Sequence, residues 1–426
     1  MVYLSEESVA VLSAKLDSYT SKANGIPGLV CTVVNKDGNR IFHHASGHRG
    51  AGVGQHMRPD DIFWLASCTK LITSIAAMQL VEQKKLSLDN EDQVERIAPE
   101  LKRVRVLEEN ADGSLELVNK KRRITLRMLL SHTAGFGYSF MNPKLKKWSD
   151  PVGVDELSGD FFDIFEQPLV NQPGERWEYG TNIDWVGLIV ERVSALSLNA
   201  YFKKFIFEPI GVENISFFPT ALMKDRLAFM HHRQTDGRID LRQHGHLYRR
   251  PLNVQSEQDI SKIVNSGGAG CFGDAAGYCE VLSVLLNNGL HKKTGSQILR
   301  KETVDEMFTN QIPQFPDFGR QYTPSSKPDL IRPSTETYPQ PHDQAQGWGL
   351  SFFTLIHPSF TGRSAGAGYW SGLANLVWWV DREQEVGGVI FSQILPFGDT
   401  EFWRCQTEVE KLLYNNLSTK GVISKM

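Results

Sequence analysis

The sequence predicts an α+β protein whose antiparallel sheet takes strands from both ends of the chain. Apolar or alternating segments typical of strands lie near the N-terminus at 28–35 and towards the C-terminus at 347–356, 375–380 and 386–393. Between these two groups, most patterned segments have the apolar spacing of helices. We therefore expect the two ends of the chain to share one sheet, flanked by helices, with a mainly helical lobe inserted between them.

The length and composition fit one large domain. The chain has 426 residues, of which 41% are hydrophobic and 22% charged, so it can bury a substantial core. We expect an α/β lobe formed by residues 1–62 and 265–426, and a helical lobe formed by residues 63–264. The formal net charge of -3 gives no electrostatic reason to expect binding to nucleic acid or to an acidic membrane.

The first part of the chain predicts a helix followed by a β-hairpin. Apolar residues recur at helical spacing in the first twenty residues, which lack both a basic leader and an unbroken apolar run. The apolar strand at 28–35 is followed by the turn Lys36-Asp37-Gly38, and residues 39–46 supply the partner strand. No apolar run in the chain is long enough to span a bilayer, so we expect an intracellular protein that does not associate with membranes.

The segment Phe63–Glu82 predicts a helix that carries reactive side chains. Ser67 and Lys70 lie three residues apart near its start, so they share one face and the amine can reach the hydroxyl. A helix start also supplies N–H groups that stabilise a negative oxygen. Alone, the pattern fits equally well a helix that merely exposes a lysine. The apolar stripe that would bury this helix consists of Leu71, Ile75, Met78 and Val81.

The middle of the chain predicts a hairpin, short helices and long irregular segments. Residues 107–123 turn at Asp112-Gly113 and read as an exposed hairpin, and Thr125 caps a short helix that stops at Gly135. Residues 138–172 are irregular and aromatic, which makes them a candidate substrate cover. Two further segments complete this part, a helix at 185–196 and an extended polar excursion at 223–253.

The glycine-rich segment Ser266-Gly267-Gly268-Ala269-Gly270 precedes a predicted helix at 274–288. It lacks the Gly-Lys-Ser/Thr ending of a phosphate-binding loop, so we interpret the glycines as positions of close backbone packing. Residues 311–345 contain many prolines and no periodicity, which predicts a long loop, and residues 401–415 predict a closing helix.

The cysteines and histidines predict neither disulfides nor a metal site. The five cysteines form an odd set with no C-x-x-C pair, which favours free thiols in a reducing compartment. Cys68 follows the candidate nucleophile but faces another side of the helix, so we interpret it as a packing residue. The histidine clusters lack the spacing of zinc ligands, and no motif calls for a metal or another cofactor.

The last three residues, Ser424-Lys425-Met426, differ only at the final position from the Ser-Lys-Leu signal for peroxisomal import. A three-residue match often arises by chance. We therefore expect a peroxisomal location if the tripeptide is used and a cytoplasmic one if it is not.

Five segments carry a family resemblance, in matching order and spacing. They are SCTK at 67–70, LRMLLSHTAGF at 126–136, PGERWEYGTN at 173–182, SGGAGCFGDAAGYCEVLSVLLNNG at 266–289 and WSG at 370–372. Together they resemble the serine β-lactamase and penicillin-binding protein superfamily, and within it the class C β-lactamase-related esterases and transesterases. The resemblance covers nearly the whole chain and implies a β-lactamase-like fold with the active site in the cleft between the two lobes.

The resemblance also implies roles for individual residues. Ser67 would be the acylated nucleophile, Lys70 the amine that activates it, and Tyr179 the proton shuttle between the hydroxyl and the leaving group. A cation near the phenol would favour a phenolate that acts as a base at neutral pH. The backbone N–H groups of Ser67 and Leu373 would form the oxyanion hole.

Two departures from the family pattern affect the substrate. The second motif, usually Tyr-x-Asn, reads Tyr179-Gly180-Thr181-Asn182 here, so the role of the asparagine could pass to Asn182. Trp370-Ser371-Gly372 stands where β-lactamases have Lys-Thr-Gly, which removes the cation that would bind a β-lactam carboxylate. Further side chains expected around the substrate are the aromatic residues Phe397, Tyr138, Trp148 and Trp370.

These observations predict a serine acyltransferase that moves an acyl group from an ester or thioester, through acyl-Ser67, to a hydroxyl acceptor. The resemblance suggests a role in secondary metabolism. Small molecules would be donor and acceptor, and the donor could be a coenzyme A or acyl carrier protein thioester. A carboxylesterase or thioesterase that hydrolyses the same intermediate is the nearest alternative. A β-lactamase, a peptidase or a non-catalytic scaffold are more distant ones.

Overall fold

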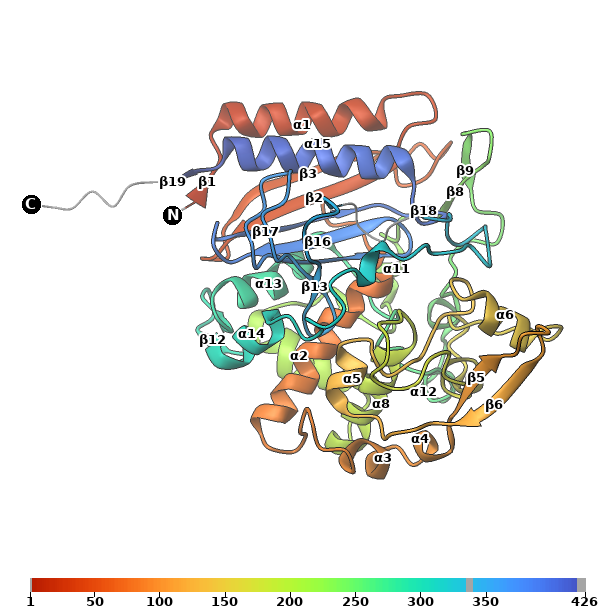
Figure 1. Ribbon diagram of the computed structural model, residues 1–426. Helices are drawn as coiled ribbons and strands as arrows, with labels where there is room; N and C mark the ends of the chain where they lie inside the picture. Colours follow the sequence, from red (N-terminus) through yellow and green to blue (C-terminus); the bar gives the residue numbers. More distant parts are fainter. Residues whose placement is uncertain (1, 335–339, 420–426) are drawn as a thin grey trace, which may run out of the picture.

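The computed structural model describes residues 2–334 and 340–419, and a seven-stranded antiparallel sheet forms its centre (Figure 1). The strand order is β13-β14-β15-β16-β17-β2-β3. These strands are β13 Gly347–Trp348, β14 Phe353–Thr354, β15 Gly368–Gly372, β16 Leu376–Asp381, β17 Val386–Phe391, β2 Gly28–Asn35 and β3 Arg40–Gly47.

The two ends of the chain meet inside this sheet. The N-terminal hairpin of β2 and β3 pairs with the C-terminal strand β17, and Ile390 lies opposite Cys31 in the antiparallel register. The strands β2, β16 and β17 are buried along their whole length, which explains their nearly continuous apolar sequences. The expectation of an α+β fold with a sheet built from both termini is confirmed.

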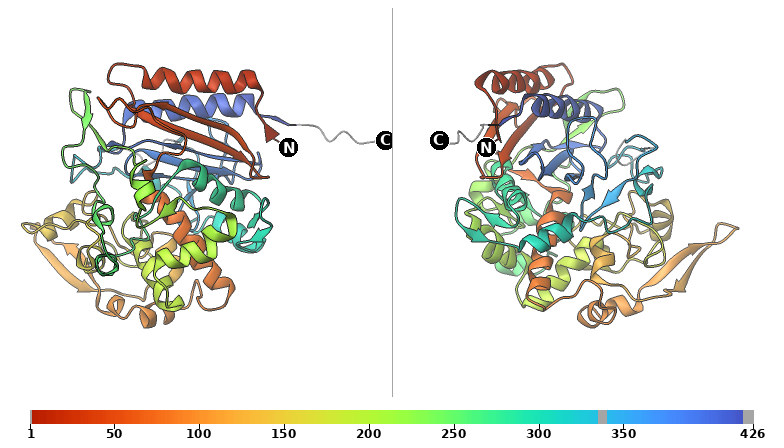
Figure 2. Two further views of the ribbon diagram at one scale, coloured as in Figure 1. Left: turned by 180° about the vertical axis from the view of Figure 1, so that it is seen from behind. Right: turned by 60° about the vertical axis from the view of Figure 1, so that its left-hand side comes forward.

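Helices cover both faces of the sheet (Figures 1 and 2). On one face, α1 Glu6–Thr20 packs beside α15 Thr400–Asn416, so the first and last long helices are neighbours. On the other face, α13 Ala275–Leu286 lies across β2 and β17. Asp274 caps α13 by accepting a hydrogen bond from the Gly277 N–H, and the helix itself is the one predicted at 274–288.

The helices on the far side of α13 surround the long helix α2, Thr69–Glu82, which packs against α8, Asn182–Ser194. The other helices are short: α3 Gln93–Ile97, α4 Glu100–Arg103, α5 Leu126–Leu130, α6 Pro143–Ser149, α7 Phe161–Phe165, α9 Leu198–Phe202, α10 Glu208–Ile210, α11 Ala221–Lys224, α12 Glu257–Ile260 and α14 Lys301–Phe308. One hydrophobic core runs through sheet and helices together. The division into an α/β lobe and a helical lobe at 63 and 264 stays a proposal.

Small sheets connect the helices and the turns. The order β4-β10-β7 joins Phe63–Trp64, Phe272–Gly273 and Ile215–Ser216, and β5 Arg105–Glu109 with β6 Leu115–Asn119 forms the projecting hairpin expected near Asp112 (Figure 2). The remaining small strands are β1 Val2–Tyr3, β19 Ser418–Thr419, β11 Leu290–His291, β12 Ser296–Gln297, β18 Ile394–Leu395, β8 His231–Arg233 and β9 Ile239–Leu241. The remaining described elements are the 3₁₀ turns η1 Ala66–Cys68, η3 Arg250–Asn253 and η4 Phe318–Arg320, and the π-helical segment η2 Lys203–Phe207.

Three expectations about local structure are wrong. The segment 63–82 is a short strand, a 3₁₀ turn and then a helix that begins only at Thr69. Its helix is buried on all sides from Thr69 to Leu80 instead of along one stripe, because it lies at the centre of the helical region. The strand expected at 347–356 is split by a turn, and the excursion at 223–253 contains α11 and the β8–β9 hairpin.

Other expectations are confirmed or lie outside the described residues. Thr125 caps α5 by accepting a hydrogen bond from the Met128 N–H, although this helix ends at Leu130 and not at Gly135 as expected. All five cysteines are buried and free. Within residues 2–334 and 340–419, no helix combines the length and apolar character needed to cross a membrane. The candidate peroxisomal tripeptide Ser424-Lys425-Met426 lies outside the described residues.

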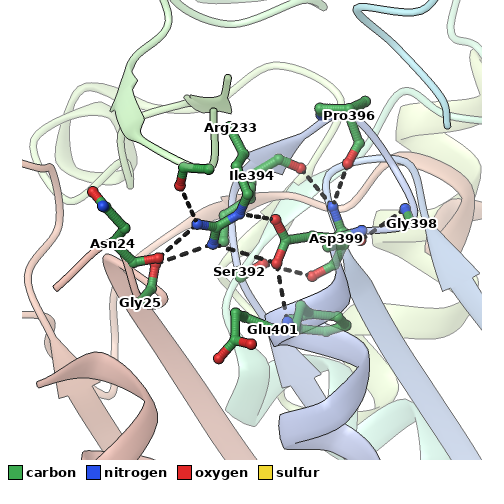
Figure 3. A network of polar contacts seen from close by, with 12 residues as sticks. Asn24, Gly25, Arg233, Ser392, Ile394, Pro396, Gly398, Asp399 and Glu401 are labelled. Atoms are coloured by element: carbon green, nitrogen blue, oxygen red, sulfur yellow. Dashed lines mark hydrogen bonds and ion pairs between the residues drawn. The ribbon is translucent and has the colours of Figure 1, made fainter. Parts of the chain in front are cut away.

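A buried ion pair fastens the N-terminus of α15 to the rest of the molecule (Figure 3). Arg233 on β8 pairs with Asp399 and also donates to the backbone carbonyls of Asn24, Gly25 and Gly237. Asp399 in turn accepts a hydrogen bond from the Phe402 N–H and so caps α15. The pair therefore joins the loop before β2, the β8–β9 hairpin and the last helix.

We expect Asp399→Ala to lower the free energy of unfolding by about 3–5 kcal/mol, because it leaves the buried Arg233 charge without its partner. Urea unfolding followed by circular dichroism measures this loss. Arg404→Ala on the same helix is the matched control, since Arg404 forms an exposed pair with Glu401 and should cost less than about 1 kcal/mol. Equal losses in the two variants would contradict this account of the ion pair.

Candidate active site

Ser67 lies in the 3₁₀ turn η1, between the short strand β4 and the helix α2. The preceding residue, Ala66, has a φ of 46°, which is an unfavourable backbone conformation for a residue with a side chain. The strand β10 holds the segment just before the turn, because the Leu65 N–H donates to the Cys271 carbonyl at 2.8 Å. The sharp turn leaves Ser67 partly exposed while its neighbours Ala66 and Cys68 are buried.

Lys70 is fully buried and its amine is at the centre of a hydrogen-bond cluster. The Nζ atom donates to the Ser67 Oγ at 3.1 Å, to the Tyr138 hydroxyl at 3.0 Å and to the Gly268 carbonyl at 2.9 Å. Three neutral oxygens thus surround the amine. The contact with Ser67 is the one that the i, i+3 spacing predicts.

This environment changes the protonation of Lys70. Burial lowers the pKa of the amine from its ordinary value of 10.5 to about 7, and the nearby carboxylate of Asp184 acts in the opposite direction. A substantial fraction of the amine is therefore neutral near physiological pH. A neutral amine can accept a proton, which a fully protonated lysine cannot.

The glycine-rich segment forms the floor under Lys70. A Cβ atom at Gly268 would lie 2.4 Å from the Asp184 carboxylate, and one at Gly267 would lie 2.7 Å from the Ile183 carbonyl. Asp184 accepts hydrogen bonds from the Gly268 N–H and the Ser266 hydroxyl, which orients the Gly268 carbonyl towards Lys70. The interpretation of these glycines as positions of close packing is confirmed.

Tyr179 and Trp370 approach the amine from the other side. The Lys70 Nζ lies 4.7 Å from the centre of the Tyr179 ring, and the Trp370 indole N–H donates to the Tyr179 hydroxyl at 2.9 Å. A donor to the phenol oxygen stabilises the phenolate form. Trp370 lies on β15, so the sheet supplies this contact. The Tyr138 hydroxyl accepts a hydrogen bond from Lys70, and burial holds the pKa of Tyr138 well above its ordinary range.

One mainly apolar cavity collects most of the predicted site residues. The predicted residues that line it are Ser67, Tyr138, Tyr179, Trp370, Ser371, Gly372, Leu373 and Phe397. Apolar side chains complete the wall: Trp64, Ala66, Phe140, Met141, Leu157, Trp177, Ala269 and Ile331. No described lining residue carries a charged side chain.

Two predicted substrate-binding residues lie elsewhere. Asn182 is fully buried beneath the cavity, and its amide donates to the carbonyls of Phe136 and Glu178 and lies 3.0 Å from the His132 Nδ1. Trp148 lies on α6 and does not line the cavity. Neither residue therefore lies at the wall of the cavity, where we expected both, and the two amide hydrogens of Asn182 already have acceptors in the protein.

His132 is a site residue that the sequence did not single out. Its backbone carbonyl accepts the Glu178 N–H at 2.8 Å and its Nδ1 accepts the Gly180 N–H at 3.4 Å, so it holds the peptide groups on both sides of Tyr179. Its ring centre lies 4.8 Å from that of Tyr179. The motif LRMLLSHTAGF contains this histidine, but one sequence does not show that the side chain faces the tyrosine.

Burial and the nearby Lys70 cation hold the pKa of His132 well below its ordinary value of 6.5. The unfolded chain therefore binds a proton below about pH 6.5 that the folded protein does not, so this residue costs stability as the pH falls. His132→Phe removes that cost and also the Nδ1 acceptor. We expect the variant to lose about 1–3 kcal/mol of unfolding free energy at pH 7.5 and less at pH 5. Urea unfolding at both pH values tests this, and a larger loss at pH 5 would contradict it.

Among the described residues, no group of three or more histidine, cysteine, aspartate or glutamate side chains could hold a metal ion. The assembled groups are instead those of serine chemistry: a partly exposed hydroxyl, a buried amine of lowered pKa, and a tyrosine whose oxygen is already hydrogen-bonded.

Comparisons with known proteins agree with this geometry. The chain is 30% identical to a lovastatin esterase from Penicillium rubens, an alignment that covers 88% of this chain and 90% of the relative. It is also 30% identical to a monacolin J acid methylbutanoyltransferase from Aspergillus terreus, with 89% of each chain covered. The resemblance to β-lactamase-related esterases and to a fungal acyltransferase of lovastatin synthesis is confirmed.

A solved structure matches the fold over almost the whole chain. Unliganded simvastatin synthase from Aspergillus terreus superimposes with a TM-score of 0.77 and 26% sequence identity, covering 96% of this chain and 98% of the other. The family model described as Beta-lactamase matches residues 14–404. The chain therefore belongs to the beta-lactamase family.

Proposed function

We propose that the protein is a serine acyltransferase that carries an acyl group on Ser67 from an ester or thioester donor to a hydroxyl acceptor. The observation that carries this proposal is the contact between the Lys70 amine and the Ser67 hydroxyl, 3.1 Å apart, at an apolar cavity. The relatives named as a methylbutanoyltransferase and an esterase support the same chemistry. A role in secondary metabolism follows from them.

The reaction proceeds by two displacements. As the Ser67 oxygen bonds to the acyl carbon, its proton passes to the neutral Lys70 amine or to a Tyr179 phenolate. The bond to the donor oxygen or sulfur then breaks, and the leaving alcohol or thiol takes that proton. In the second half, an acceptor hydroxyl gives its proton to the same base and attacks the acyl carbon, which releases Ser67 in its original state.

The developing negative charge needs donors near Ser67. We propose that the backbone N–H groups of Ser67 and Leu373 supply them, since both residues line the cavity and β15 packs directly against η1. A Cβ atom on Gly372 would lie 2.8 Å from the Leu65 carbonyl, so only glycine allows this close approach. The sheet thus brings one donor to a nucleophile that the helical region carries.

The cavity favours an apolar acyl group over a β-lactam or a peptide. Trp370 occupies the place of the lysine that binds a carboxylate in β-lactamases, and its indole N–H is already bonded to Tyr179. The described lining residues offer no cation to a carboxylate. A non-catalytic scaffold would have no reason to bury an amine against a serine hydroxyl. We therefore rank these alternatives below acyl transfer.

A carboxylesterase or thioesterase remains the nearest alternative, because water and a hydroxyl acceptor attack the same acyl-Ser67. The donor is proposed to be a free ester, a coenzyme A thioester or a thioester on an acyl carrier protein. Purified protein should be incubated with one acyl group on each of the three carriers, with and without candidate alcohols. The ratio of ester product to free acid then separates transfer from hydrolysis.

We expect p-nitrophenyl butyrate to acylate Ser67, because the neutral amine can take the hydroxyl proton. Intact mass after a quenched reaction should show one butyryl group, and peptide mapping should place it at Ser67. Ser67→Ala should abolish the adduct, whereas Ser74→Ala, a serine further along α2 that does not line the cavity, should retain it. An adduct on the Ser67→Ala variant, or none on the wild type, would overturn the proposed function.

A further inference from the structure

We infer that Asn375 is a positioning residue that determines which acyl chains the cavity accepts, because it braces the turn that carries Phe397. This inference rests on the proposed acylation of Ser67. Asn375 does not line the cavity, so any influence on the acyl group must act through another side chain.

Asn375 ends the turn between β15 and β16, and its side chain is fully buried. The amide donates to the Ile394 carbonyl at 2.9 Å and to the Pro396 carbonyl at 3.0 Å. Its oxygen accepts the N–H groups of Gly398 at 3.2 Å and Asp399 at 3.1 Å. All four bonds, two donated and two accepted, go to the turn 394–399. An asparagine that only stabilised its own turn would instead bond to neighbouring residues in the sequence.

The turn braced in this way forms a wall of the cavity. The Phe397 N–H donates to the Leu330 carbonyl at 2.8 Å, and its carbonyl accepts the Arg332 N–H at 3.0 Å. Ile331, which lies between these two partners, lines the cavity together with Phe397. A shift of the turn therefore moves two apolar side chains that face the substrate.

The far end of the turn is fixed independently. Asp399 is held by the buried pair with Arg233, in the cluster that Figure 3 shows. With Asp399 fixed, the Asn375 side chain ties the middle of the turn to the end of the β15–β16 turn, and so helps to set its position relative to Trp370 and Leu373. The distance between the acyl wall and the reacting groups depends on this brace.

The turn after β15, which lies next to the reacting groups, is also held by bonds that do not use the Asn375 side chain. We therefore expect it to keep its position when that side chain is removed. The Ile394 N–H donates to the Ala374 carbonyl at 3.0 Å, and the Ser392 hydroxyl donates to the Asn375 carbonyl at 2.7 Å. In both bonds the acceptor is a backbone carbonyl of the turn after β15, so neither bond needs the Asn375 side chain. Asn375 also has a φ of 57°, which glycine adopts without strain, so Asn375→Gly removes the brace and keeps the backbone.

We expect Asn375→Gly to change selectivity among acyl chains more than reactivity. The readout is kcat/KM for p-nitrophenyl acetate, butyrate and octanoate. The acetate ester, whose acyl group is too short to use the wall fully, should stay within about threefold of wild type. The octanoate-to-acetate ratio should fall by about tenfold or more, because a loosened wall loses apolar contact with a long chain. A purely structural defect would lower all three esters by the same factor.

A double-mutant cycle tests whether the effect passes through Phe397. Phe397→Ala should lower the same ratio, and the double variant should show little further change. Asn375→Asp, which keeps the acceptor but loses the two donated bonds, provides a second route if Asn375→Gly does not fold, and its ratio should also fall. An unchanged ratio in both Asn375 variants, or fully additive effects with Phe397→Ala, would overturn the inference. Failure of the wild type to be acylated would instead overturn the proposed function.

Discussion

The burial of the Lys70 amine is the constraint on which the site depends. An amine removed from water loses much of its tendency to hold a proton, and here the three oxygens of Ser67, Tyr138 and Gly268 surround it, with no carboxylate of the described residues in direct contact. Burial of the Lys70 amine lowers the stability of the folded state, and packing of the surrounding fold offsets this loss. Helix α2 is buried on all sides, and the glycine-rich segment approaches it closely enough for a backbone carbonyl to serve as the third partner.

The architecture explains why so many distant segments contribute to one cavity. The helical region carries Ser67, Lys70 and Tyr179, whereas the sheet carries Trp370 and the turn with Leu373. Pairing of β2 with β17 closes the sheet, and β15 then packs directly against η1, the turn from which α2 begins. Trp370 contributes to the cavity in two ways. It forms part of the wall without bringing a charge, and it supplies an indole N–H that bonds to Tyr179.

Sequence patterns predicted the parts of this protein that depend on local periodicity and on ordered motifs. The terminal strands, the hairpin at β5–β6, the cap of α5 and the pair of Ser67 with Lys70 follow from spacing and from capping residues. Asn182 and Trp148 were expected at the substrate but do not line the cavity, since residue type does not show which way a side chain faces. His132 bonds to the peptide after Tyr179, and Asn375 bonds to the turn 394–399. Both partners are remote in the sequence, and apolar periodicity does not predict such contacts.

The protonation of Lys70 is the central physical claim, and its titration tests the claim most directly. Protein labelled with ¹⁵N at the lysine side chains can be followed by NMR between pH 5 and 11, with Lys70→Arg identifying the signal. The account predicts a midpoint near pH 7, in keeping with the lowered pKa of the buried amine. A midpoint near the ordinary lysine value, about 10.4, would show that the amine stays charged and cannot activate Ser67 as described.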